Sequence, residues 1–172
     1  NYLKSGSLFE AAAALGGIAA TNKPEDVDKL AKFGKYFGNA YQIRDDIIDA
    51  FTPKGYEKSP NNDLLNGDPS LLLLYAVDSD KITAEDKAAL LSVYQGESKD
   101  LDVDLIHRIY KYTGSLQKSI DKMEEFANLA GEILKDSPDC DARSSLLELL
   151  DQYNHNFTEN LESIASHQNQ SH

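Results

Sequence analysis

The sequence has one cysteine, few basic residues and no long apolar run, and each scarcity excludes a class of protein. The lone thiol, Cys140, can form neither an internal disulfide nor a zinc site built from cysteines. Lys and Arg number 17 against 29 Asp and Glu, a net charge of −12, which argues against a surface for nucleic acid or anionic lipid. No apolar stretch approaches the roughly 20 residues that span a bilayer, and no signal pattern begins the chain. We therefore expect a cytoplasmic protein that inserts into no membrane.

Helical periodicity extends along the 172 residues, whereas strand signals are almost absent. Proline and glycine interrupt this periodicity at a few places, most clearly in a polar loop over residues 52–66. The pattern predicts a single all-α domain over residues 1–172. The expected helices lie at residues 2–20, 25–51, 69–76, 84–94, 101–112, 115–135 and 141–165.

The long helix expected at residues 25–51 is apolar around more than half of its circumference. The opposite side is a narrow stripe of small, amide and acidic residues, and its members are Gly34, Gly38, Gln42, Asp45, Asp46 and Asp49. A helix with so much apolar surface is usually buried. We therefore expect the stripe to line a cavity.

Three carboxylates lie close together at the carboxyl end of this stripe. Asp45 and Asp49 are one helical turn apart, and Asp46 lies beside them, so their charges repel one another. The helix dipole also disfavours anions in the last turns. A cation resolves both conflicts, and carboxylate oxygens without His or Cys favour Mg²⁺. The alternative is an ordinary solvated acidic face.

The residues around these aspartates resemble a known motif. Tyr41 and the segment 42–49, Gln-Ile-Arg-Asp-Asp-Ile-Ile-Asp, resemble the second aspartate-rich motif of the trans-isoprenyl diphosphate synthases, the polyprenyl synthetase family. Upstream, Lys4 and Ser5 are similar to that family's Lys-Thr segment. Downstream, Lys58 matches a Gly-Lys position, although Glu57 replaces the Gly. Order and spacing agree over residues 4–75.

One further segment matches with a departure. Residues 63–71, Asp-Leu-Leu-Asn-Gly-Asp-Pro-Ser-Leu, resemble the family's Asp-x-x-x-Gly-Lys-x-Thr-Leu stretch, and Asp68 replaces the usual Lys. This exchange removes a positive charge and adds a negative one near the expected diphosphate site. It is expected to weaken diphosphate binding, to shift the metal requirement or to mark a degenerate subunit.

The resemblance implies a fold and an activity. The fold is part of the antiparallel helix bundle of isoprenoid synthases. The activity is that of a Mg²⁺-dependent trans-prenyltransferase of the geranyltranstransferase type. It condenses an allylic diphosphate with isopentenyl diphosphate and releases pyrophosphate, giving products such as geranyl, farnesyl or geranylgeranyl diphosphate. A cytoplasmic homodimer is also implied.

The resemblance also assigns roles to individual residues. Asp45, Asp46 and Asp49 bind Mg²⁺, which holds the allylic diphosphate. The other implied residues bind substrate, and all but Tyr41 are expected to act in catalysis: Lys4, Tyr41, Gln42 and Lys58. Taken alone, the two lysines would be solvated surface residues, Tyr41 a core aromatic and Gln42 a polar residue in helix packing.

One part of the family pattern is missing from these residues. A first Asp-Asp-x-x-Asp motif followed by an Arg pair does not occur among the 172 residues. We therefore expect this chain to be the carboxyl-terminal half of a synthase and to be inactive alone. One alternative is a non-catalytic helper subunit of a heteromeric synthase. Another is an acidic helical interaction module that binds no diphosphate.

Overall fold

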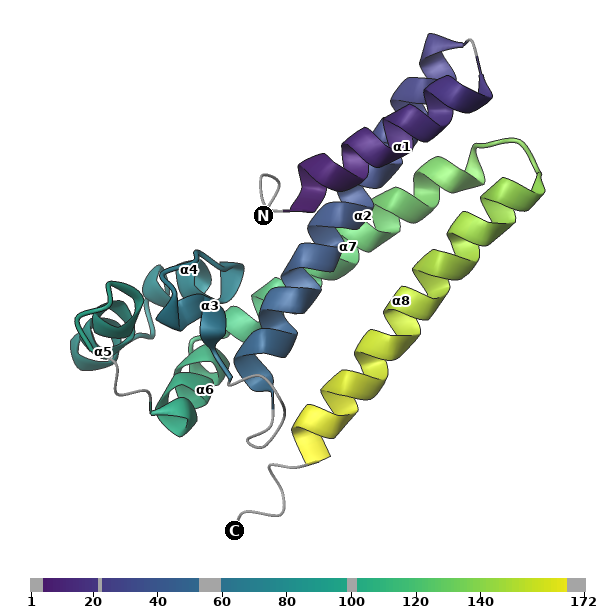
Figure 1. The fold of residues 1–172 in the computed structure, drawn as a ribbon. Coiled ribbons are helices and arrows are strands. Elements are labelled where there is room, and N and C mark those ends of the chain that lie inside the picture. The colour runs from purple at the N-terminus through teal and green to yellow at the C-terminus, as the bar shows by residue number, and fades with distance from the viewer. Residues whose placement is uncertain (1–4, 22, 53–59, 99–101, 167–172) are drawn as a thin grey trace. The chain divides into compact units, whose positions relative to one another are not determined.

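A computed structural model describes residues 5–21, 23–52, 60–98 and 102–166, with the backbone alone for residues 154–166. Every regular element within these ranges is a helix, as the sequence predicts (Figure 1). In chain order the helices are α1 (Ser7–Ala20), α2 (Pro24–Phe51), α3 (Asn62–Leu65), α4 (Leu71–Val77), α5 (Ala84–Tyr94), α6 (Val103–Tyr112), α7 (Ser115–Lys135) and α8 (Asp141–Ser166).

The expected helix boundaries agree with the structure except in one region. Helices α5 and α7 have the expected bounds, and the ends of the others differ by a few residues. The expectation of an irregular loop over residues 52–66 was wrong, because α3 forms inside it. A single turn such as α3 is too short to show helical periodicity, so the sequence gives no signal for it.

Three of the shorter helices begin at side-chain caps. Ser70, Thr83 and Asp102 precede α4, α5 and α6, and each accepts a hydrogen bond from the backbone N–H three residues later. A cap of this kind satisfies one of the N–H groups left without a partner at a helix start and contributes about 1 kcal/mol. Asp102 is thus the start signal of α6.

The chain divides into two compact units, which are described separately. Unit 1 contains the described parts of Asn1–Gln42 and Lys122–Ser166, and unit 2 contains the described part of Ile43–Asp121. Helices α2 and α7 contribute to both units. The prediction of one domain over residues 1–172 stays a prediction.

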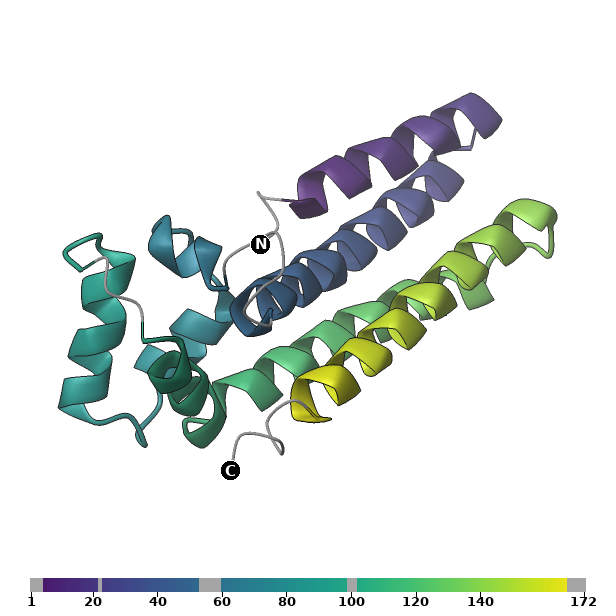
Figure 2. The ribbon, with the colours of Figure 1, turned by 60° about the horizontal axis from the view of Figure 1, so that its bottom comes forward.

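In unit 1, α1 folds back along the first part of α2 (Figures 1 and 2). Glycines in α2 allow this approach: a Cβ added at Gly34 would lie 2.3 Å from the Phe9 carbonyl oxygen, and one added at Gly38 would lie 2.8 Å from Phe9 Cβ. The expectation that this part of the stripe lines a cavity was therefore wrong. Its small residues make room for a neighbouring helix.

An aromatic cluster joins α8 to α2 in the same unit. Phe37 packs against Tyr153 with ring centroids 5.4 Å apart, and Tyr36 of α2 stacks on Phe126 of α7 at 6.2 Å. The Tyr153 hydroxyl donates a 2.6 Å hydrogen bond to the Ala40 carbonyl oxygen. Burial of the Phe37 and Tyr153 rings contributes roughly 2–3 kcal/mol each.

We expect Tyr153→Phe to lower the free energy of unfolding by about 1 kcal/mol, because it removes a buried hydrogen bond and retains the ring. Urea unfolding followed by circular dichroism measures this change. Tyr112→Phe is the matched control, since the hydroxyl of Tyr112 binds the carboxylate of Asp86 in a less buried setting. Equal changes in the two variants would contradict the prediction.

Unit 2 is built around the end of α2 and the short helices α3 to α6. Helix α4 contacts α5 and α6, and α3 contacts α5. Large buried side chains come from several of these helices, and they include Ile47, Phe51, Leu64, Leu72, Leu90, Ile106, Ile109 and Tyr110. The shared core fixes the end of α2, which carries the acidic motif, against α3 and α6.

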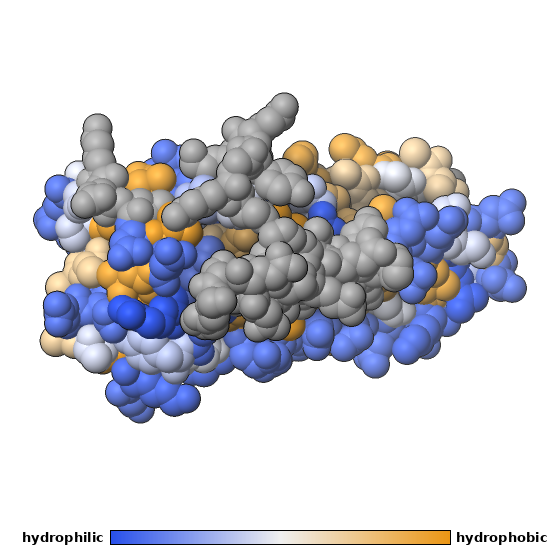
Figure 3. All heavy atoms as spheres, turned by 90° about the horizontal axis from the view of Figure 1, so that it is seen from below, coloured by the Kyte–Doolittle hydropathy of each residue, from blue (hydrophilic) through white to orange (hydrophobic). Residues whose placement is uncertain are grey.

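Two surface properties bear on function. Among the described residues, no helix combines the length and hydropathy needed to cross a membrane. On the coloured part of the face drawn in Figure 3, hydrophilic residues predominate and apolar residues are visible between them. Exposed large apolar residues occur mainly on α1, where Leu8, Leu15 and Ile18 are more than half exposed.

Candidate metal and diphosphate site

The three aspartates of the acidic motif lie on α2 in unit 2, in three different environments. Asp45 is exposed, Asp49 is half-buried, and Asp46 has 3% of its surface exposed. The helix therefore presents Asp45 and Asp49 to solvent on one side, while Asp46 turns inward. The spacing in the sequence predicts the shared helix but not this division.

The carboxyl of Asp49 has the most perturbed environment of the three. Its Oδ2 accepts a hydrogen bond from the backbone N–H of Asp63 at 3.0 Å. Burial raises the pKa of Asp49 most strongly, the negative charges of Asp63 and Asp45 raise it further, and the hydrogen bond from Asp63 opposes them. This carboxyl thus lies in an excess of negative charge that a cation would relieve.

The buried hydroxyl of Tyr110 lies in the field of the same carboxylates. Tyr110 of α6 is 1% exposed, and its ring lies 6.3 Å from that of Phe51. Burial, and after it the charges of Asp49 and Asp63, raises the pKa of its hydroxyl. Tyr110 therefore remains a neutral hydrogen-bonding group at any physiological pH.

The predicted substrate-binding residues Tyr41 and Gln42 lie in unit 1. Gln42 is buried, and its Oε1 accepts a hydrogen bond from the hydroxyl of Ser5. The partly exposed ring of Tyr41 lies 5.4 Å from that of Phe9 and 6.3 Å from that of Tyr153. Ser5 occupies the position of the threonine in the family's Lys-Thr segment, so the described end of this segment contacts Gln42.

Two predicted diphosphate ligands, Lys4 and Lys58, lie outside the described residues, so their roles stay predictions. Asp68 is described and partly exposed, and its backbone N–H donates to the Asp63 carbonyl oxygen at 2.8 Å. Asp68, which replaces the family lysine, is thus hydrogen-bonded through the backbone to Asp63, whose own N–H binds Asp49.

The donor set on α2 fits a hard divalent cation. In the described ranges, no three His, Cys, Asp or Glu side chains converge into a closed metal site. Mg²⁺ does not require such a site, because it is usually bound through one or two carboxylates, with waters and substrate phosphates completing its octahedron. Asp45 and Asp49 offer such carboxylates, one exposed and one half-buried on the same side of α2.

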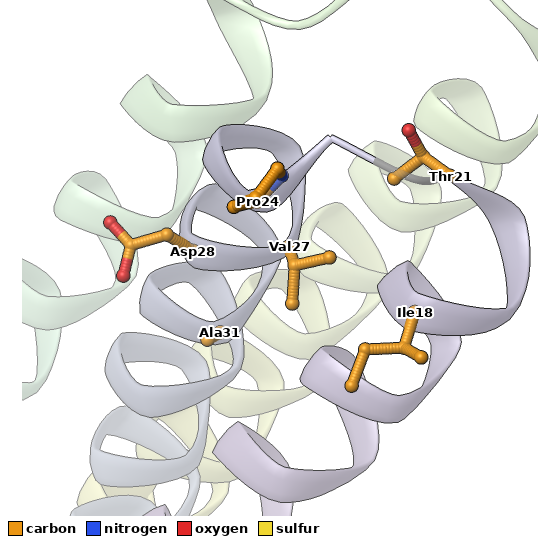
Figure 4. A pocket seen from close by; sticks show the side chains of 6 residues that line it. All are labelled: Ile18, Thr21, Pro24, Val27, Asp28 and Ala31. Atoms are coloured by element: carbon orange, nitrogen blue, oxygen red, sulfur yellow. The ribbon is translucent and has the colours of Figure 1, made fainter.

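A pocket in unit 1 has no comparable chemistry. It has a volume of about 530 Å³ and lies at the turn between α1 and α2. Ile18 and Val27 point toward each other across it, whereas Asp28 points away (Figure 4). Among the described residues, none of the predicted catalytic or metal-binding side chains lines this pocket.

Comparison with known proteins places the chain in a family. Residues 1–113 match the family described as polyprenyl synthetase. The chain belongs to this family. It is 32% identical over 152 residues to the octaprenyl diphosphate synthase of Escherichia coli, a match covering 86% of this chain and 46% of that protein. It is also 32% identical over 153 residues to the geranylfarnesyl diphosphate synthase of Aeropyrum pernix, covering 88% and 46%.

Solved structures of the family confirm the isoprenoid synthase type of helix bundle. The geranylgeranyl pyrophosphate synthase of Bacteroides thetaiotaomicron superposes with a TM-score of 0.72 at 28% identity, over 86% of this chain and 48% of that one. The enzyme of the same name from Corynebacterium glutamicum, solved with calcium and isoprenyl diphosphate, gives 0.70 at 29% identity, over 94% and 48%. The chain spans about half the length of the relatives it matches.

Sequence reasoning missed two residues at the acidic end of α2. Asn61 and His107 both bind the Ala50 carbonyl oxygen, at 3.1 and 2.7 Å. His107 is one of four scattered histidines and carries no recognisable spacing. Asn61 lies two residues before the family segment that begins at Asp63, and this position is the signal in the sequence that could have pointed to it.

Proposed function

We propose that this chain supplies the second aspartate-rich motif of a polyprenyl diphosphate synthase. Such an enzyme breaks the allylic carbon–oxygen bond of one diphosphate, and the bonding electrons leave with pyrophosphate. The double bond of isopentenyl diphosphate attacks the allylic cation, and loss of a proton completes the condensation. The observation that carries the proposal is the family motif on α2, where the half-buried carboxyl of Asp49 lies near the negative charges of Asp63 and Asp45.

The aspartates are proposed to hold the metal that grips the allylic diphosphate. Asp45 and Asp49 supply accessible oxygens, and the buried Asp46 is proposed to act behind them as the third carboxyl of the motif. The chemistry that Mg²⁺ provides when bound is neutralisation of the charge developing on the leaving pyrophosphate. A metal-dependent reaction is in keeping with the relative that was solved with calcium and isoprenyl diphosphate.

The remaining roles follow from the family resemblance. Gln42, fixed by Ser5, is proposed to hydrogen-bond near the diphosphates. Tyr41 is proposed to line the cavity for the prenyl chain, where an aromatic face stabilises a carbocation. Lys4 and Lys58 are proposed to contact the diphosphate as point charges. The homodimeric state, the cytoplasmic location and a short-chain product stay predictions, since the matched relatives are named for products of different length.

The test is a condensation assay on the natural protein or complex that contains this sequence. It is isolated through a tag on the chain and incubated with labelled isopentenyl diphosphate and dimethylallyl, geranyl or farnesyl diphosphate. We expect labelled prenyl diphosphate to form with Mg²⁺ and not with EDTA. The 172-residue chain alone is expected to be inactive. Absence of product with every allylic substrate would overturn the proposal.

A second candidate is a helper subunit, which Asp68 in place of the family lysine favours. The intact mass of the isolated material shows whether one chain or two are present. If turnover requires a second chain and survives Asp45→Asn in this one, the chain is a helper. If Asp45→Asn abolishes turnover, the chain contributes directly to catalysis.

A further inference from the structure

The last carbonyl groups of α2 accept hydrogen bonds from the adjacent Thr52 and from two more distant residues, Asn61 and His107. The last carbonyl groups of a helix have no partners within it. Here the Thr52 hydroxyl donates to the Ile48 carbonyl oxygen at 2.7 Å, and the Asn61 backbone N–H donates to that of Asp49 at 2.9 Å. The Ala50 carbonyl oxygen accepts the further bonds from Asn61 and His107 already described.

Asn61 adopts a rare conformation to make these contacts. It is 1% exposed and has φ 60° and ψ 36°, the left-handed region that asparagine tolerates better than most residues. Its backbone N–H and its side-chain Nδ2 bind successive carbonyl groups of α2. A left-handed residue in a buried position persists only where its surroundings hold it.

His107 reaches the same helix end from α6. Its ring stacks on Phe51 with centroids 4.5 Å apart and planes inclined by 21°. Because a carbonyl oxygen only accepts, the bond to Ala50 requires the proton on Nε2. The stack and the bond together fix the last turn of α2 against α6.

This closure extends to the carboxylate of Asp49. Asp63 follows Asn61 by two residues, and its backbone N–H donates to Asp49 Oδ2. The side chain of Asn62, between them, also hydrogen-bonds this carboxyl. Asn61 therefore holds the backbone of Asp49 directly and places the group that orients its side chain. Residues that orient a metal ligand change metal affinity by about 10- to 100-fold when they are removed.

We propose that Asn61 and His107 are positioning residues that orient Asp49 toward the bound cation. The proposal rests on the proposed function, since it needs Asp49 to face a metal. It predicts that removal of either side chain lowers the affinity for the cation, although neither side chain contacts the cation. All of the contacts that carry it lie within unit 2.

The test measures Mn²⁺ binding in the presence of pyrophosphate, with free Mn²⁺ detected by electron paramagnetic resonance. Asn61→Gly removes the side-chain donor and retains the left-handed backbone, and His107→Phe removes the donor and retains the stacked ring. We expect each to weaken Mn²⁺ affinity about 10-fold. His107→Gln, which restores an N–H donor, is expected to recover most of it. Asn66→Ala, at an exposed asparagine of the same segment, is the control and should leave affinity unchanged.

The outcomes separate this inference from the proposed function. If the wild-type chain binds Mn²⁺ and both variants bind it equally well, the inference is overturned. The inference is also overturned if the variants unfold at lower urea concentration but bind Mn²⁺ as tightly as the wild type when folded. Asn61 and His107 would then have a purely structural role. If the wild-type chain binds no Mn²⁺, or Asp45→Asn leaves binding intact, the proposed function itself fails.

Discussion

Asp45→Asn is expected to reduce Mg²⁺-dependent turnover of the natural enzyme by about 100-fold or more, because it removes a charged metal ligand from the diphosphate site. In the isolated chain the same change should reduce Mg²⁺-dependent affinity for pyrophosphate, which titration calorimetry measures. Asp45 is exposed, so the free energy of unfolding should change by no more than about 0.5 kcal/mol.

The matched control for this variant is Asp28→Asn. Asp28 lies on the same helix, is exposed and pairs with Lys32 at 2.8 Å, so the substitution changes the net charge equally. We expect it to leave both turnover and pyrophosphate affinity unchanged. Equal losses in the two variants would mean that overall charge, and not the motif, governs binding.

Gly34→Ala should be the most destabilising substitution of a small residue in unit 1. The new Cβ would lie 2.3 Å from the backbone oxygen of Phe9 and 2.8 Å from the Cβ of Ala13. Neither atom belongs to a flexible side-chain end, so α1 must move away from α2. We expect the free energy of unfolding to fall by about 3 kcal/mol, an overpacking cost that exceeds the gain in helix propensity of about 1 kcal/mol.

Gly16→Ala provides the opposite result within the same unit. A Cβ at Gly16 would meet no atom within 4 Å, so the substitution brings the propensity gain alone. Urea unfolding should therefore show Gly16→Ala equal to or more stable than the wild type. A stability loss at Gly16 comparable to that at Gly34 would contradict this picture of helix packing.

The sequence predicted the helices and the acidic motif because both depend on local spacing. Helix α7 is long and amphipathic enough for apolar periodicity to define it, and the placement of Asp45 and Asp49 on one helix follows from the periodicity of α2. The prediction that Gly34 and Gly38 line a cavity was wrong because small residues on a helix can border either a cavity or a closely packed helix. Only the contact with Phe9 distinguishes the two.

The contacts around the acidic motif were beyond prediction for a different reason. The bond from His107 to Ala50 joins residues separated by 57 positions, and nothing in a periodic pattern relates them. The burial of Asp46 likewise depends on tertiary packing, since wheel geometry places it beside two more exposed neighbours. The sequence motif thus predicts which carboxylates bind the metal, whereas the fold determines their exposure, their charge environment and their orientation.

The most direct test of the proposed metal site is paramagnetic broadening of amide resonances by Mn²⁺ and pyrophosphate. Substoichiometric Mn²⁺ is added to the isotope-labelled chain, and the loss of each signal reports its distance from the ion. We predict selective loss of signals from residues 42–50 and 61–64, and protection by excess Mg²⁺. Broadening centred on the acidic surface of residues 136–141, or spread evenly over the chain, would contradict a metal site at Asp45 and Asp49.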